Sequence, residues 1–325
     1  MRKIDHRLLA GIATGAFLLA GSAAMAQTTD TSGDPEITVI GSRAPNRTVL
    51  DSPVPVDVIR GDAIRQAGAT GELAQSIGTL VPAFNFPRQS NSGVGDTVRA
   101  AQLRGLSPDQ VLVLVNGKRY HTTSTPALDT KVGKGTAPVD LNTLPINGVG
   151  RLEVLRDGAA AQYGSDAVAG VINIGLDRMD HGFVADMTYG MNVTKPRAVG
   201  KTIDDGRNIS GALKFGTKLG DGGFLTVGGD YTHQQGTNRA GFDQGGQFLS
   251  NGSYTDPRND QFFGKRLFKV GDPRVDSGHL WYNAETPVGG DLTFYSFGVA
   301  HARKSVGANF FRWPVIVDGN GNDYL

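Results

Sequence analysis

The clearest pattern in the chain is an alternation of hydrophobic and polar residues in its second half. From Gly182 to Val193 a hydrophobic residue occupies every second position, and the same period returns from Ile209 and from Phe224. A segment from His279 to Thr286 keeps the alternation, whereas in Leu292 to Arg303 the hydrophobic residues change face midway. A period of two over about ten residues is typical of strands that cross a membrane. The pattern therefore predicts membrane-spanning β-strands.

The connections between these segments alternate in length. Leu219–Gly223 and Pro287–Gly290 are tight, whereas Val193–Asn208 and Gln235–Gly278 are long. Outer-membrane barrels combine short periplasmic turns with long outer loops, so this asymmetry favours a barrel. Periodicity by itself leaves a soluble β-sandwich open as the alternative.

The first half of the chain has a mixed α/β pattern. A strand is predicted within Val54–Ile59, followed by a helix over Gly61–Leu80. Glycines at 68 and 71 divide that helix into two pieces, and Pro82 ends it because proline cannot continue a helix.

Three further strands are predicted in this half. Val111–Val115 is a continuous apolar run of the buried type, and Asn116-Gly117 after it favours a type I′ hairpin turn, since both residues tolerate a positive φ. Leu152–Leu155 and Gly170–Ile174 are the other two strands, with a turn or short helix over Gly158–Tyr163.

The N-terminus has the features of an export signal. An apolar run from Leu8 to Leu19 follows three basic residues and precedes Ala24-Met25-Ala26, a peptidase-type site. The run is too short for a membrane-spanning anchor, the alternative. Gln27–Pro35 is polar and turn-rich, which predicts a flexible leader. Glu36–Arg43 is an isolated β-prone stretch that needs a partner strand. The alternative is that it forms the first strand of the next domain.

Composition excludes several classes of function. The chain has 46 glycines among 325 residues, which disfavours a helical protein, and it has no cysteine for disulfides or thiolate chemistry. Lys plus Arg is 32 against 31 for Asp plus Glu, so no nucleic-acid partner is indicated. The six histidines are scattered and no catalytic motif is complete. We therefore expect no enzyme activity, cofactor or metal site.

Four stretches of the sequence resemble TonB-dependent receptors. They are EITVIGSR at 36–43, SPVPVDVI at 52–59, LRGLSPDQVLVLVNGKR at 103–119 and RLEVLRDGAAAQYGSDAVAGVINI at 151–174. The last is long and specific, and the four stretches are spread over residues 36–174.

The resemblance implies the fold and its division into domains. The fold class expected is an α+β plug domain followed by antiparallel transmembrane strands of an incomplete β-barrel of about 22 strands. Residues 1–26 would be the signal peptide, 27–52 a flexible leader with a TonB box, 53–176 the plug domain and 177–325 the first barrel strands. Because an open sheet in lipid leaves unpaired backbone groups, residues 1–325 are expected to be incomplete.

The resemblance also implies which residues act. The TonB box would be Glu36, Ile37, Thr38, Val39 and Ile40, pairing as a strand with a TonB-type periplasmic energy-transducing protein. The leader is too short for the signalling domain of transcription-regulating members, so transport without surface signalling is expected. The plug motif residues are Arg104, Gly105, Asn116, Gly117, Arg119, Glu153, Arg156, Asp157, Gly158, Tyr163, Gly164, Asp166 and Gly170.

Five charged residues of that motif have two possible roles. In the family such charges commonly bridge the plug to the barrel wall; the alternative is that they are exposed on a periplasmic face. They are Arg104, Arg119, Glu153, Arg156 and Asp166. Two irregular segments rich in Ser, Thr, Gly and Asn, Phe84–Asp96 and Thr122–Ala137, are predicted to form the outer apices of the plug that contact a ligand.

The function that the resemblance implies is TonB-dependent uptake of a large scarce solute. A ferric siderophore is the expected solute, the outer membrane with its lipid is the expected location, and the signal peptide is expected to be cleaved near Ala26. The alternatives are a truncated plug fragment that acts as a periplasmic binding module, and a passive substrate-gated pore that needs no TonB box.

Overall fold

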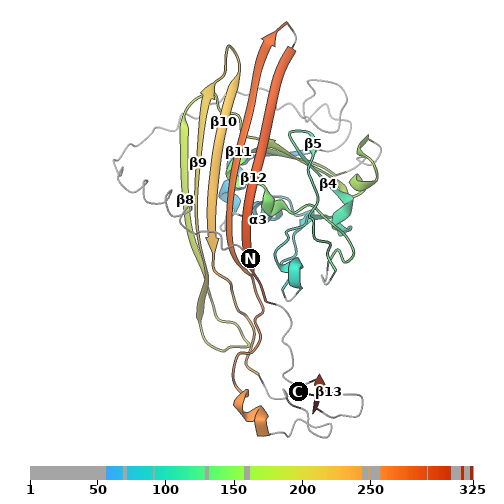
Figure 1. The fold of residues 1–325 in the computed structure, drawn as a ribbon, viewed down its shortest axis with the longest axis vertical. Helices are drawn as coiled ribbons and strands as arrows, with labels where there is room; N and C mark the ends of the chain where they lie inside the picture. The colour runs from blue at the N-terminus through green and yellow to red at the C-terminus, as the bar shows by residue number, and fades with distance from the viewer. Residues whose placement is uncertain are drawn as a thin grey trace, which may run out of the picture. The chain divides into compact units, whose positions relative to one another are not determined.

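Two five-stranded sheets dominate the part of the chain that the structure describes (Figure 1). The computed structural model describes residues 56–68, 72–90, 92–128, 132–156, 162–243, 248, 257–290, 292–308, 316–317 and 323–324. The predicted signal peptide, leader and TonB box lie outside these residues, as do Asp157 and Gly158 of the predicted plug motif.

The first sheet, called the mixed sheet below, has the strand order β1-β6-β7-β4-β5. Neighbouring strands are antiparallel except β4 and β7, which run parallel. Its strands are β1 (Val56–Arg60), β4 (Val111–Val115), β5 (Lys118–Arg119), β6 (Val149–Leu155) and β7 (Gly170–Leu176). Residues 56–176, which contain it, are called the mixed-sheet region.

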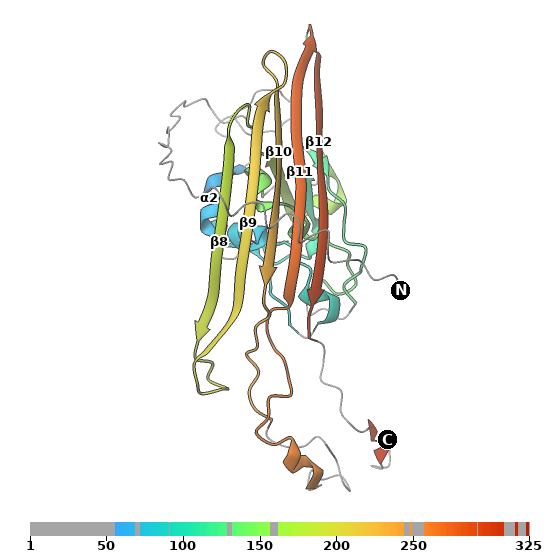
Figure 2. The ribbon, with the colours of Figure 1, turned by 60° about the vertical axis from the view of Figure 1, so that its left-hand side comes forward.

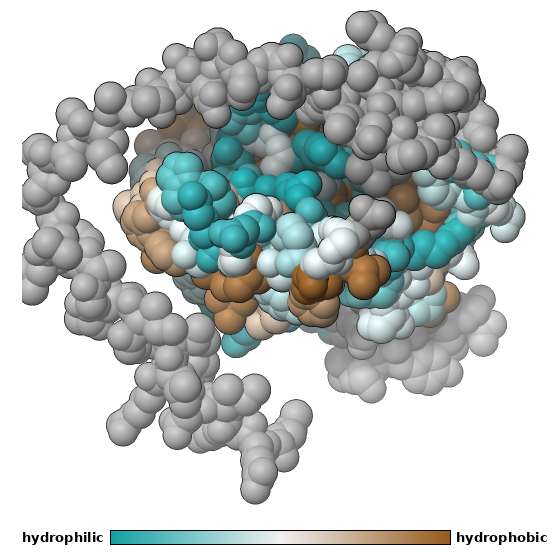
Figure 3. Space-filling view, turned by 90° about the horizontal axis from the view of Figure 1, so that it is seen from above, coloured by the Kyte–Doolittle hydropathy of each residue, from teal (hydrophilic) through white to brown (hydrophobic). Residues whose placement is uncertain are grey.

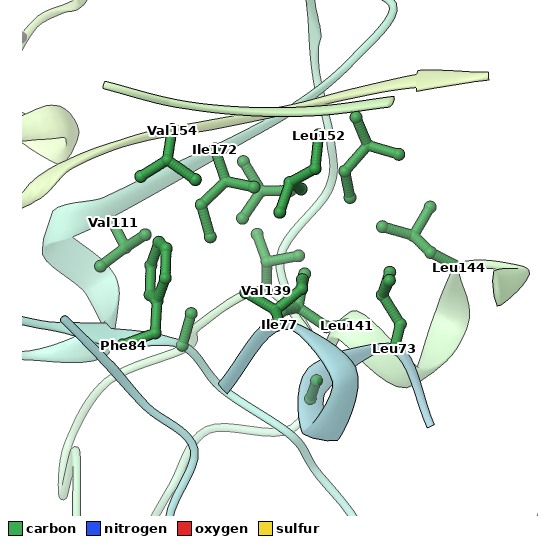
Figure 4. Close-up of a cluster of buried hydrophobic side chains, with 14 of the residues drawn as sticks. Leu73, Ile77, Phe84, Val111, Val139, Leu141, Leu144, Leu152, Val154 and Ile172 are labelled. Carbon is green, nitrogen blue, oxygen red and sulfur yellow. The ribbon is translucent and has the colours of Figure 1, made fainter. Parts of the chain in front are cut away.

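The mixed sheet has a hydrophobic core on each face. Strands β4 and β7 are buried along their whole length, as expected from their nearly continuous apolar sequences. The larger core includes Leu73 and Ile77 from α3 (Leu73–Leu80) and Ile172 from β7 (Figure 4). Each large side chain buried in this way contributes about 1.5–3 kcal/mol. A smaller cluster on the other face contains Val56, Leu112, Leu114, Leu155, Ala167 and Val171.

The predicted strands, divided helix and hairpin turn of this region are confirmed, whereas most of Gly158–Tyr163, predicted as a turn or short helix, lies outside the described residues. The helix forms two pieces, α2 (Gly61–Ala67) and α3, and α3 ends two residues before Pro82. Asn116 and Gly117 have φ of 46° and 75°, and Leu114 and Val115 pair with Arg119 and Lys118 across the turn. The Asn-Gly pair therefore makes the predicted hairpin.

The second sheet, called the meander sheet below, is antiparallel, and its strands lie side by side in sequence order (Figure 2). Its strands are β8 (Phe183–Thr194), β9 (Ile203–Lys218), β10 (Phe224–Gln234), β11 (Arg274–Gly289) and β12 (Leu292–Val306). Register is continuous between β9 and β10 and between β10 and β11, and shifts once between β8 and β9 and once between β11 and β12.

Two of these strands are longer than the alternation predicts. Strand β9 begins at Ile203 rather than near Ile209, and β11 begins at Arg274 rather than near His279. The added residues are mostly polar or glycine on both faces, so a hydrophobic period of two cannot show there. Backbone pairing continues past the hydrophobic band.

The irregular alternation in strand β12 has a structural cause. Phe297, on the face that would be polar in a regular alternation, packs against the core of the mixed-sheet region. The ammonium group of Lys118 lies 5.7 Å from the ring centre of Tyr295 on the same face. The hydrophobic residues change face because this strand meets an apolar surface on its covered side.

The remaining elements are short. They are β2 (Phe84–Asn85), η2 (Gly93–Asp96), β3 (Gln102–Leu103), η3 (Pro108–Gln110), η4 (Leu141–Thr143), η5 (Ile146–Gly148), η6 (Ser165–Ala167), η7 (Pro257–Gln261), β13 (Ile316–Val317) and β14 (Asp323–Tyr324). Among the described residues, no helix has both the length and the apolar character to cross a membrane.

Candidate functional site

The meander sheet exposes its hydrophobic face and covers its polar face. Large apolar side chains lie exposed on one side: Phe183, Met187, Tyr189, Met191, Val193, Ile209, Leu213, Phe215, Val227, Tyr231, Leu280, Tyr282, Leu292, Phe294 and Val306. In Figure 3 many hydrophobic residues lie at the left and lower edge of the coloured part of the molecule. A soluble sandwich would bury that face, so the sandwich alternative is wrong and the sheet is of the lipid-facing kind.

The opposite face of the meander sheet is polar and buried. Its buried residues are Asn208, Lys214, Thr226, Gln234, Ser277, His279, Trp281 and Asn283. Buried polar groups need hydrogen-bond partners, and the mixed-sheet region supplies many of them. This contact between the two sheets is the candidate functional site.

The two ends of the meander sheet differ. Tight turns join β9 to β10 and β11 to β12 at one end, and the connections 195–202 and 235–273 lie at the other (Figure 1). We refer to these as the tight-turn end and the long-loop end. In outer-membrane barrels the tight turns are periplasmic and the long loops face outward.

Near the tight-turn end, the hairpin turn of the mixed sheet is bonded to β11. The Asn116 amide donates to the side-chain oxygen of Asn283 (3.1 Å) and accepts from the Leu176 backbone N–H (2.8 Å). Asn283 in turn donates to the backbone oxygens of Leu176 (3.3 Å) and Asp177 (3.1 Å). The predicted turn therefore also joins the two sheets.

An ion pair lies beside this asparagine cluster. The buried Lys214 ammonium of β9 pairs with the Asp177 carboxylate, just after the mixed sheet ends. Arg178 pairs with Glu285 at 2.7 Å and stacks over the Phe224 ring at 4.8 Å. The segment that leaves the mixed sheet is thus held to three strands of the meander sheet.

Farther along the sheet, η4 of the mixed-sheet region contacts β11 and β12. Arg303 pairs with Asp140 at 2.5 Å. Nε2 of His279 lies 3.1 Å from the Asn142 backbone oxygen, while Nδ1 lies 2.7 Å from Asp230. The pKa of Tyr120 in this region is raised because burial disfavours its ionised form; Asp140 adds to this, while a hydrogen bond with Thr143 opposes it.

At the long-loop end a four-charge cluster ties the mixed-sheet region to the 235–273 connection. Arg88 pairs with Glu72 (2.5 Å) and Asp272 (3.0 Å), and the buried Arg99 lies 3.8 and 3.7 Å from the same two carboxylates. Burial lowers the pKa of Arg88, but the two carboxylates outweigh it and the pKa is raised. Gly271 N–H also donates to the Ser90 hydroxyl at 2.8 Å.

Beside this cluster is a hollow of about 130 Å³. It is lined by Gln89, Ser92, Gly95, Val98, Ala100, Thr123, Thr125, Pro126, Ala127, Leu128, Val132 and Pro138. The two segments predicted as apices, 84–96 and 122–137, both contribute to it, and the Val132 N–H donates to the Gln89 side chain at 3.3 Å. Ligand sites usually exceed about 300 Å³, so this hollow suits only part of a large ligand.

The motif glycines that the structure describes occupy positions that side chains tolerate poorly. Gly105, Gly117, Gly164 and Gly170 have φ of 75°, 75°, 102° and 145°. A Cβ on Gly170 would lie 2.5 Å from the Leu155 backbone oxygen. These glycines therefore have a conformational or steric reason to be glycine.

The charged residues of the motif contact other residues of the mixed-sheet region. Arg119 bonds Asp166 and the Tyr163 backbone oxygen. Arg156 pairs with Asp57 at 2.7 Å, and Arg104, whose φ is 55°, donates to the Ala169 oxygen at 3.2 Å.

Glu153 is the buried charge of the mixed sheet. It is fully buried, lies 2.9 Å from the Arg151 guanidinium and accepts from the Asn173 amide at 2.9 Å. Asn173 accepts from the Gly117 N–H at 2.9 Å, so Glu153 is linked to the hairpin turn.

The contacts described for the five motif charges, Arg104, Arg119, Glu153, Arg156 and Asp166, lie within the mixed-sheet region. Their bridges to the barrel wall stay a prediction. The exposed alternative fits Arg119 and Asp166, whose side chains are about half exposed, but not Glu153.

Sequence reasoning missed the residues that do join the sheets. They are Arg88, Asn147, Lys214, Asp272, Trp281 and Asn283. One signal was present: Trp281 is a large aromatic residue at a position of the polar alternation, between His279 and Asn283. Within the described ranges, no cluster of three or more His, Cys, Asp or Glu residues is arranged to hold a metal ion.

The chain is similar to known receptors. The family described as TonB-dependent Receptor Plug Domain matches residues 48–171. The ferric enterobactin receptor PirA of Pseudomonas aeruginosa is 32% identical over 158 residues, 49% of this chain and 21% of that protein. The vitamin B12 transporter BtuB of Vibrio cholerae is 44% identical over 72 residues, 22% of this chain and 10% of the transporter.

A solved structure shows the same fold. A variant of the ferric enterobactin receptor PfeA of Pseudomonas aeruginosa matches 79% of this chain and 34% of its own chain, with a TM-score of 0.55 and 19% identity. The chain spans about a fifth of the length of its first curated relatives. The family match, these relatives and the plug-like region bonded to a lipid-facing sheet lead to one conclusion: residues 48–171 match the plug domain of TonB-dependent receptors, and the chain is similar to those receptors.

Proposed function

We propose that the protein takes up a large solute across the outer membrane, using energy delivered by a TonB-type periplasmic protein. The observation that carries the proposal is the meander sheet, which presents apolar side chains outward and binds the plug through its polar face. Such a sheet suits a barrel wall closed by a plug. The family consists of receptors and transporters rather than enzymes.

The proposed roles of the segments follow their order along the chain. After cleavage near Ala26, residues 27–52 would carry the TonB box, 53–176 would form the plug and 177–325 would begin the wall in outer-membrane lipid. In this division Glu36–Ile40 pairs as an added strand with the periplasmic partner, which needs only backbone groups and alternate side chains.

Energy transfer would begin at β1. This strand is the first described element after the leader and an edge of the mixed sheet, paired only with β6. Val56 pairs with Leu155 at the end nearest the leader, so a pull from the leader would open the ladder one pair at a time. Unpairing in succession requires less force than breaking all pairs together.

The solute would approach from the long-loop end. The hollow between the two apical segments lies beside contacts with the 235–273 connection, so a ligand there would meet both plug and loop. A ferric siderophore is the proposed solute class, supported by relatives whose names state ferric enterobactin as the ligand. Motif residues Arg104 to Gly170 would shape the plug rather than contact the solute.

Deletion of Glu36–Ile40 tests the proposal. In cells fed radiolabelled ferric enterobactin as the iron source, uptake should fall to the level of cells without the gene. The matched control is deletion of five leader residues, Thr28–Ser32, which shortens the leader equally and should leave uptake near normal. Undiminished uptake after deletion of the box would favour the passive pore and contradict active transport.

The plug-fragment alternative needs a different measurement. An antibody against the plug would be used on separated outer-membrane and periplasmic fractions. A band well above the 34.3 kDa of this chain in the outer membrane supports the transporter. A species of that size or smaller confined to the periplasm would leave a binding module and end the transport proposal.

A further inference from the structure

One asparagine of the plug inserts its side chain among three strands of the meander sheet. Asn147 lies in the short turn η5 and is 2% exposed. Its amide nitrogen donates to the backbone oxygens of Leu213 (3.4 Å) in β9 and Gly229 (3.1 Å) in β10. Its side-chain oxygen accepts from the indole N–H of Trp281 (3.1 Å) in β11.

The chemistry of this contact fixes the side chain in one orientation. An amide offers two N–H donors and one carbonyl acceptor, and here both kinds of atom are used. If the amide were reversed, its oxygen would face two carbonyl oxygens and its nitrogen would face an N–H group. Two of the three partners are strand backbone oxygens and the third is the indole N–H of a strand residue, so the bonds of Asn147 depend on the position of the meander sheet itself.

The ring of Trp281 adds a steric part to the contact. The side chain is 3% exposed although it stands on the polar face of its strand. A Cβ on Gly228 of β10 would lie 2.7 Å from the indole, and one on Gly148 of the plug would lie 2.9 Å from it. The ring therefore fits between a wall glycine and a plug glycine, and neither position tolerates a larger residue without movement.

We propose that Asn147 and Trp281 form a joint that seats the plug against β9, β10 and β11 and keeps the lumen closed to large solutes at rest. Both are positioning residues. A buried aromatic ring with a satisfied N–H, enclosed by close-packed glycines, has the properties of an interface hot spot. The inference rests on the proposed function, since it requires the meander sheet to be part of a barrel wall.

The test is the entry of fluorescent vancomycin, a solute too large for ordinary pores, into cells that make the protein but lack TonB. Asn147→Asp keeps the shape of the side chain but removes both donors and places a charge against two carbonyls. Trp281→Phe keeps an aromatic ring but removes the N–H donor. Each should raise the entry rate about tenfold, because leaving a buried polar group unpaired lowers the ratio of seated to unseated plug by about that factor.

The two variants combined should admit vancomycin about as fast as the faster single variant, because both break the same joint. The control is Asn85→Ala, a plug asparagine whose exposed amide bonds Gln102 within the plug at 3.3 Å. It should not change entry. Immunoblots would establish equal amounts of protein in the outer membrane. If Asn147→Asp does not accumulate there, the measurement on Trp281→Phe alone tests the proposal.

Two results would overturn the proposed joint. One is that vancomycin enters no faster in Asn147→Asp and Trp281→Phe than in Asn85→Ala, and the other is that the effects of the two single variants multiply in the double variant. Because the assay is done without TonB, it is independent of energised uptake. Leak in these variants together with normal uptake after deletion of Glu36–Ile40 would uphold the joint and reject active transport.

Discussion

The plug and the meander sheet are built from similar strand-forming residues but place their apolar side chains in opposite surroundings. In the plug, β7 is buried along its whole length and its apolar residues pack against protein. In the meander sheet, Leu280 is 69% exposed, while Lys214 of β9 is 5% exposed. Which side chains are buried therefore depends on the medium that each face of a sheet meets. An apolar side chain is favourable in lipid, and a polar one is favourable where another part of the chain can form a hydrogen bond or ion pair with it.

The boundary between the two regions is polar, which distinguishes it from either core. Asparagine amides, ion pairs and one indole N–H join plug to wall. Such contacts fix position and can exchange with water, whereas separating two apolar surfaces would cost more as the area grows. The proposed uptake, in which the plug is held and then moved, suits an interface of this kind.

The largest effect is expected from a charge placed in the plug core. Ile172→Asp buries a carboxylate in β7, where Ile172 is fully buried, and should lower the free energy of unfolding of the plug by more than about 4 kcal/mol. The measurement is protease resistance of the plug in the membrane-inserted protein. Ile172→Val, the control, should cost only about 0.5–1.5 kcal/mol. Unchanged protease resistance in the Asp variant would contradict the burial of β7 in a packed plug core.

A charge on the outward face of the meander sheet should cost somewhat less. Leu280→Arg lies midway along β11 and should lower the free energy of unfolding in lipid by about 2–4 kcal/mol. Urea titrations in lipid vesicles would measure it, with Leu280→Phe as the control that remains apolar. In a sheet facing water the same change would be nearly neutral, so a neutral result would remove the lipid-facing assignment.

The polar boundary is tested by Lys214→Ala. This change leaves Asp177 without its ammonium partner and should weaken the seating of the plug by about 1–3 kcal/mol. Hydrogen exchange of the backbone around residue 177 would report the loosening. Lys218→Ala removes a lysine at the exposed end of the same strand and should have no effect there. Equal exchange in the two variants would show that the ion pair does not hold the plug.

The smallest effect is expected at the hairpin turn. Gly117→Ala places a Cβ where φ is 75° and should destabilise the plug by about 1 kcal/mol, since left-handed backbone is unfavourable for alanine. The matched control is Gly211→Ala in β9, where an added Cβ would meet open space. Urea unfolding of both variants would compare them; similar midpoints would mean that the turn carries no conformational strain.

Prediction from sequence succeeded where a rule depends on neighbours in the chain. The Asn116-Gly117 turn, the divided helix and the strands with a period of two follow from local backbone and side-chain preferences. The early starts of β9 and β11 escaped prediction because their pairing is set by the neighbouring strand. The apical segments were identified from composition, and the structure brings both to one hollow.

The candidate site was less predictable, for a physical reason. Strand-forming residues, the apolar face of each strand and the turns can be recognised from the sequence, because these properties depend on period and local conformation. The packing of the two sheets is what makes β4 run parallel to β7, brings Asp272 to Arg88 and brings Asn147 to Trp281. Such partners are separated by 59 to 184 positions and meet only when two sheets pack, and no local preference encodes that distance.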